Sequence, residues 1–96
     1  MSEKTLPYDS AAVLDTPQAI GEYLTVAFET SDSALIAHAL GVVAKARGMS
    51  ELARETGLSR QSLYRALSAD GRPELPTLVK VMKAFGVRLA AVEASR

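Results

Sequence analysis

Apolar side chains recur at helical intervals along most of this chain, and polar or glycine-containing breaks divide them into groups. The first group predicts an amphipathic helix from Thr16 to Glu29, because Thr16 and Pro17 are typical of an N-cap and a first helical position. Its apolar face is formed by Ile20, Leu24, Ala27 and Phe28. Residues 1–15 show no sustained period, which predicts an extended or turning N-terminal arm.

The second group predicts the most apolar helix of the chain. We expect it to begin at a cap formed by Ser31 or Asp32 and to stop at Gly48. Apolar residues occupy most of its sides, so it is predicted to be central. The remaining polar strip comprises His38, Gly41 and Lys45.

Three shorter helices are predicted in the second half of the chain. They are expected at 50–56, at 59–68 and from Pro76 to a stop at Gly86, with a turn at 70–73. Residues 87–92 alternate loosely and are predicted to form a short edge strand or an extended tail. The chain is therefore predicted to be an all-α, five-helix protein in which residues 16–96 form one helical domain.

Residues 49–68 have the pattern of a helix-turn-helix. Ala53 is small, as required where a second helix crosses closely, and Gly57 suits a turn with positive φ. Inward-facing leucines would hold both helices to the core; they are Leu52, Leu58, Leu63 and Leu67. In such a motif the second helix enters the major groove of DNA.

Polar residues on this second helix are candidates for DNA contact. Gln61, Tyr64, Arg65 and Ser68 are spaced as one helical stripe, opposite the leucines. Gln and Arg side chains can pair with adenine and guanine, respectively. Ser59 and Arg60 at the start of the helix, and Arg72 in the following turn, complete the predicted interface. The alternative interpretation is an ordinary helical hairpin with a solvated polar face.

The formal charge is zero overall but is divided between two halves of opposite sign. Residues 1–44 carry a balance of −5, and residues 45–96 carry +5. Such asymmetry favours two different partners, of which the basic half would face nucleic acid. The simpler alternative is chance combined with solvated helix faces.

Several classes of function are disfavoured by what the chain contains. It has no cysteine, which fits a cytoplasmic location, and no apolar run long enough for a membrane span. Its single histidine, His38, has no second metal ligand or nucleophile at a useful spacing. We therefore expect neither an enzyme nor a cofactor or metal site.

The residues around the predicted motif resemble a known family. The run RGMSELARETGLSRQSLYRALS, followed by Gly71, Pro73, Thr77 and Lys80-Val81, is similar to the addiction-module antidote proteins, the HigA-like antitoxins. Their DNA-binding motif is of the lambda-repressor-like (Xre/Cro) type. The likeness extends upstream through Pro7-Tyr8-Asp9, Tyr23-Leu24 and Asp32, and covers about residues 5–90.

The resemblance implies a homodimer that binds its operator DNA, represses its own operon and neutralises a RelE/ParE-superfamily toxin. The acidic first half would then meet the basic toxin, through the arm and the first helix. The candidate toxin-binding residues are Tyr8, Asp9, Leu14, Glu22 and Glu29. The predicted dimer surface is the fifth helix around Phe85 together with the tail from Val87 to Val92.

Two other functions remain as alternatives. One is a stand-alone prophage-type regulator whose first helix only completes the core. The other is a small enzyme or enzyme subunit that uses the acidic face, which the lack of catalytic groups disfavours.

Overall fold

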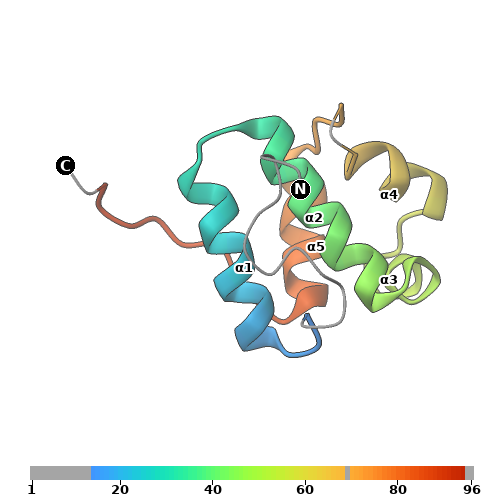
Figure 1. Ribbon diagram of the computed structural model, residues 1–96. Helices are drawn as coiled ribbons and strands as arrows, with labels where there is room; N and C mark the ends of the chain where they lie inside the picture. The colour runs from blue at the N-terminus through green and yellow to red at the C-terminus, as the bar shows by residue number, and fades with distance from the viewer. Residues whose placement is uncertain (1–13, 69, 95–96) are drawn as a thin grey trace, which may run out of the picture.

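The computed structural model describes residues 14–68 and 70–94. Five helices follow in order, as shown in Figure 1: α1 (Pro17–Glu29), α2 (Ser33–Arg47), α3 (Met49–Thr56), α4 (Arg60–Ala66) and α5 (Leu75–Phe85). The chain reverses between α1 and α2, which lie side by side, while α3 and α4 lie on the other side of α2 from α1. The prediction of an all-α protein with five helices is confirmed.

Side-chain caps fix where the first helices begin. The Thr16 hydroxyl accepts a hydrogen bond from an amide in the first turn of α1 at 3.1 Å, with Pro17 following it. The Asp32 carboxylate accepts two amide hydrogen bonds from the first turn of α2, at 3.0 and 3.2 Å. Of the two predicted caps for α2, Asp32 is therefore the one used.

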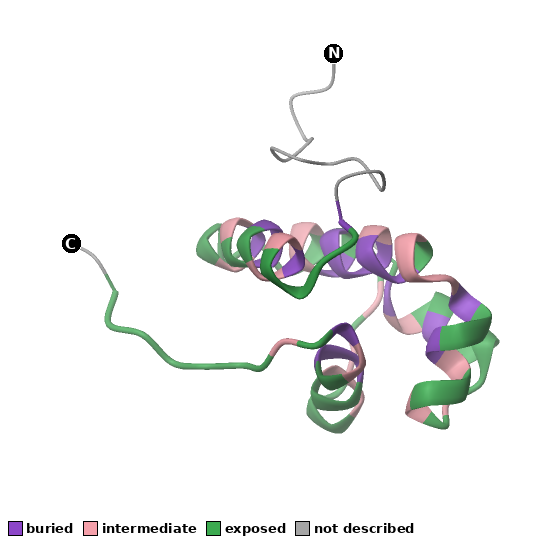
Figure 2. Ribbon diagram, turned by 90° about the horizontal axis from the view of Figure 1, so that it is seen from below, coloured by how far each residue is buried: buried purple, intermediate pink, exposed green. Residues whose placement is uncertain are grey.

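One hydrophobic core joins all five helices. Its fully buried large side chains include Tyr23, Leu24, Leu40, Leu52, Leu63 and Phe85. Figure 2 shows the buried residues on the sides of the helices that face one another. Tyr23 was not predicted as a core residue, although its spacing of three residues from Ile20 and four from Ala27 places it on the same helical face.

Arg47 connects the ends of three helices. Its guanidinium donates a hydrogen bond at 2.9 Å to the carbonyl oxygen of Ala84, in the last turn of α5. The same group forms an ion pair with Glu55 of α3, with an N–O distance of 3.4 Å. A cation at the carboxyl end of α5 also opposes the negative end of the helix dipole. Arg47 therefore serves packing.

Gly41 lies in a close contact between α2 and the end of α4. A Cβ atom placed on Gly41 would lie 2.4 Å from the carbonyl oxygen of Leu67. Gly41 is buried, so its assignment to the polar strip of α2 was wrong. Helical periodicity could not predict that Gly41 is buried, because glycine has no side chain whose apolar character would mark it as part of the buried face.

Of the two forms predicted for residues 87–92, a short edge strand or an extended tail, the edge strand is not formed. Residues 87–94 have no regular secondary structure and lead away from the body past α1 (Figures 1 and 2). Only the beginning of this segment is fixed, since the Val87 amide donates a hydrogen bond to the Met82 carbonyl at 3.1 Å. A strand needs a neighbouring strand for its backbone hydrogen bonds, and the described residues offer none.

We expect Gly41→Ala to lower the free energy of unfolding by about 1–3 kcal/mol, because the added methyl would force α2 and α4 apart. Gly21→Ala is the matched control. It adds the same atom inside α1, where its nearest neighbour would be the Val87 side chain at 3.8 Å. Helix propensity then predicts a gain of about 0.5–1 kcal/mol for Gly21→Ala. Urea unfolding measures both changes, and effects of the same sign would contradict this explanation.

Candidate nucleic-acid interface

The turn between α3 and α4 contains three residues, Gly57, Leu58 and Ser59. Gly57 has φ +76°, in the left-handed region, as its position in the sequence predicted. Its amide donates to the Ala53 carbonyl at 2.9 Å, and the Leu58 amide donates to the Thr56 hydroxyl at 3.2 Å. Local hydrogen bonds thus define the direction in which the chain enters α4.

Two leucines hold α4 against the body. Leu63 is fully buried and Leu67 is nearly so, as predicted. The N-terminal end of α4 is capped by Ser59, whose hydroxyl accepts a hydrogen bond from the Ser62 amide at 3.0 Å. Because one face of this short helix is fixed inward, the opposite face is presented to solvent.

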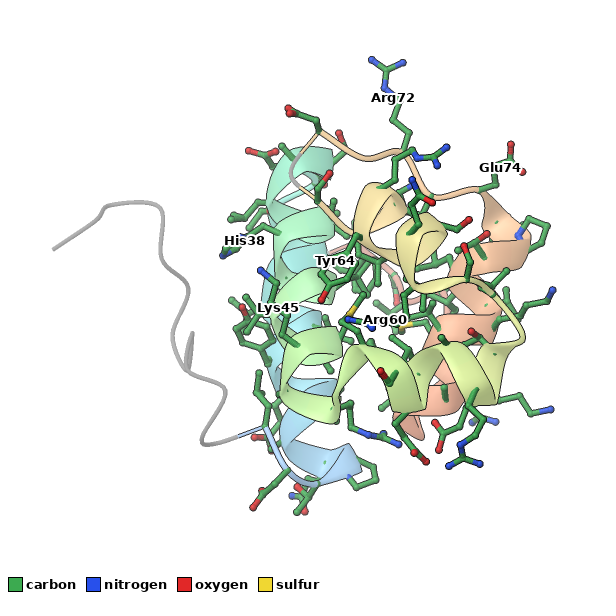
Figure 3. The ribbon with its side chains drawn as sticks, turned by 90° about the vertical axis from the view of Figure 1, so that its right-hand side faces the viewer. His38, Lys45, Arg60, Tyr64, Arg72 and Glu74 are labelled. Carbon is green, nitrogen blue, oxygen red and sulfur yellow. The ribbon has the colours of Figure 1, made fainter. Side chains whose placement is uncertain are left out.

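The predicted DNA-contact residues are all exposed; they are Ser59, Arg60, Gln61, Tyr64, Arg65, Ser68 and Arg72. Arg60, Gln61, Tyr64 and Arg65 belong to α4 itself. Figure 3 shows Arg60 and Tyr64 on this helix and Arg72 pointing away from the body beyond it. The arrangement brings aromatic, amide and guanidinium groups to one end of the molecule.

Ser68 is the exception to the predicted stripe. α4 ends at Ala66, and Leu67 leaves helical geometry with φ −105° and ψ 34°. Ser68 therefore follows the helix, and its hydroxyl donates to the Arg65 carbonyl at 3.2 Å. The helix expected at 59–68 therefore ends about two residues earlier than predicted.

The arginines of this region fall into two groups. Arg54 of α3 is hydrogen-bonded to Glu51, and this bond and the nearby positive charge lower the pKa of the Glu51 carboxyl. Arg47 pairs with Glu55. In contrast, Arg60, Arg65 and Arg72 form no ion pair within the described part of the chain. Unpaired guanidinium groups remain available to bind phosphate or base edges.

The residues predicted to bind a toxin are dispersed. Glu22 and Glu29 are exposed on α1, on the other side of α2 from α4. Leu14 is 2% exposed and packs in the core, so in this conformation it is not a surface residue. Tyr8 and Asp9 lie outside the described residues.

No other chemical site stands out in residues 14–68 and 70–94. Within these ranges, no group of three or more His, Asp or Glu side chains could hold a metal ion. None of the helices described is both long and apolar enough to span a lipid bilayer. The free arginines around α4 and the carboxylates on α1 are thus the chemical features that the fold presents.

The fold and this surface define a small, all-helical protein with a basic, solvent-exposed helix at one end. The chain belongs to the family described as probable addiction module antidote protein, whose model matches residues 4–93. An uncharacterized protein of Haemophilus influenzae is 41% identical over 88 residues, which cover 92% of this chain and 91% of the relative. No solved structure matches the chain significantly.

Proposed function

We propose that this protein is the antitoxin of a type II toxin–antitoxin module, and that it also binds operator DNA to repress its own operon. The observation that carries the proposal is membership of the antidote family along nearly the whole chain. An antidote requires a toxin to counter and acts as a regulator, not an enzyme.

The α3–α4 pair supports the DNA-binding half of the proposal. A left-handed glycine at the turn, buried leucines on one face and free arginines on the other are typical of a helix-turn-helix. In this lambda-repressor-like arrangement α4 is the recognition helix. Gln61 and Arg65 would read base edges, and Arg72, which lies beyond α4, would contact the backbone.

The acidic half of the chain supports the toxin-binding half of the proposal. Residues 1–44 carry a net charge of −5, and Glu22 and Glu29 are exposed two turns apart on α1. Such a surface complements a basic protein, as expected for a RelE/ParE-type toxin that handles nucleic acid. The arm is proposed to add to this contact by ordering on the toxin.

The alternative is a stand-alone regulator without a toxin. It shares every feature of the α3–α4 surface and differs only in the role of the arm and α1. The test is whether a neighbouring gene encodes a basic protein of about 100 residues that binds this protein. If the two proteins are co-expressed and recovered together in a pull-down, the antitoxin is favoured over the stand-alone regulator. No complex with such a neighbour would favour the stand-alone regulator.

We expect removal of residues 1–13 to strongly weaken toxin neutralisation and to change operator binding by no more than a few-fold. Leu14 must be kept, because its burial makes it part of the core. Reversing Glu22 and Glu29 to Lys should slow association with the toxin and reduce its salt dependence, since steering charges act mainly on the on-rate. Growth rescue and surface plasmon resonance measure these effects.

Thermal unfolding of the same truncated protein is the control. If the arm only packs on the core, the truncation lowers the melting temperature and harms toxin and DNA binding alike. A stable truncated protein that neutralises the toxin at full strength would refute the proposed role of the arm.

For DNA, we expect Arg65→Ala and Gln61→Ala each to cost about 1–3 kcal/mol on the operator and little on random-sequence duplex. Arg72→Ala should weaken both about equally, because a backbone contact carries no sequence information. Fluorescence anisotropy on the two duplexes measures the difference. Equal losses on both duplexes for the first two variants would exclude direct base readout.

A homodimer is proposed because a single short recognition helix offers little surface for specific binding. Phe85 itself is fully buried, in agreement with its inward position in the helical pattern, so it cannot contact a partner. The candidates on α5 are the exposed apolar residues Leu75 and Val79, one turn apart. Leu89 and Val92 of the tail are also exposed. A two-fold dimer would place recognition helices about 34–36 Å apart on a pseudo-palindrome.

We expect light scattering to give a dimer at tens of micromolar, and Val79→Glu to shift it toward monomer because the substitution buries a charge in the interface. Glu29→Gln, on α1, is a control that should leave the mass unchanged. A wild-type protein that stays monomeric with and without operator would contradict the dimer.

A further inference from the structure

Two exposed cationic or polar side chains of α2 lie next to the recognition helix of the proposed motif. His38 and Lys45 are seven residues apart on α2, and Gly41 lies between them on the same side of the helix. Because Gly41 is the point where α2 meets the Leu67 carbonyl, this side of α2 faces the end of α4. Figure 3 shows His38 and Lys45 on α2 and Tyr64 and Arg60 on α4.

The charge on this surface has one sign. No Asp or Glu occurs between Asp32 and Glu51 or between Glu55 and Asp70, so neither α2 nor α4 contains a carboxylate. Lys45 is exposed and has no hydrogen bond or ion pair with any described residue. Arg47, two positions further along the chain, is in contrast hydrogen-bonded to the Ala84 carbonyl and paired with Glu55. The packing of the helices does not require the charge of Lys45.

Dimensions favour a DNA strand as the partner of this charge. The major groove is about 12 Å wide, so a helix lying in it has a phosphate strand on each side. Gly41 meets the Leu67 carbonyl at the end of α4, and Lys45 lies one helical turn further along the same side of α2. Lys45 therefore lies toward one flanking strand when α4 occupies the groove.

We propose that Lys45 forms a phosphate-binding extension of the DNA interface on α2. This inference rests on the proposed DNA-binding function of α4. The lysine ammonium is a point charge on a flexible stem, so it binds the backbone without reading sequence. The phosphate contact of Lys45 would help to fix the position of α4 along the groove. It would also increase the affinity for any duplex, whatever its sequence.

The test measures binding as a function of salt concentration for the full chain and two charge-neutral variants. The probes are a duplex carrying the promoter region of the protein's own gene and a random-sequence duplex. For Lys45→Gln we expect the slope of log K against log salt to fall by about 0.9, and affinity to drop roughly three- to tenfold on both duplexes. Lys45→Arg should keep the wild-type slope.

Arg54→Gln is the matched control, because it removes one exposed positive charge that Glu51 already neutralises within α3. It should leave the slope unchanged. An unchanged slope for Lys45→Gln, or an equal loss for both variants, would overturn the inference while α4 remains the DNA-binding element. If the wild-type protein binds neither duplex, the proposed DNA-binding function itself is wrong, and the role of Lys45 falls with it.

Discussion

The contact between Gly41 and the Leu67 carbonyl determines how the surface of the molecule is arranged. No other residue type could occupy position 41 without moving one of the two helices, since a Cβ would lie 2.4 Å from a backbone oxygen. The contact sets the end of α4 directly against α2, while Leu63 and Leu67 hold the same helix to the core. Two rigid elements therefore present their exposed faces as one surface, and preorganised groups bind a ligand at a lower entropic cost than mobile ones.

Charge pairing divides the basic residues by role. Arg47 and Arg54 are matched with carboxylates of α3, and the pair at Arg47 also completes the end of α5. The cations of α4 and Lys45 have no such partners within the described helices. Exposed ion pairs contribute little to stability, so the same fold could hold more of them at small cost. The unpaired charges of α4 and Lys45 are thus not required for folding, which is consistent with the external anion proposed for them.

Local signals in the sequence predicted most of the helices, because caps and glycine stops act within a few residues. Thr16 and Gly57 behave as their chemistry requires, and the inward leucines of α4 were identified from spacing alone. The errors concern contacts between elements. Gly41 was assigned to a polar strip and Leu14 to the toxin-binding residues, yet both are buried. Periodicity indicates which side of a helix is apolar, but not which neighbour will cover it.

The zero net charge of the chain conceals two separate surfaces of opposite sign. Glu22 and Glu29 lie on α1, and Arg60 and Arg65 lie on α4, with α2 between these helices (Figure 1). One whole helix, about 10 Å across with its side chains, lies between α1 and α4, whereas the Debye length at physiological salt is about 8 Å. Each surface is therefore largely screened from the other, so the proposed partner of one would be little affected by the charge of the other. A five-helix body of this size is thick enough for an acidic and a basic partner to be bound by one chain.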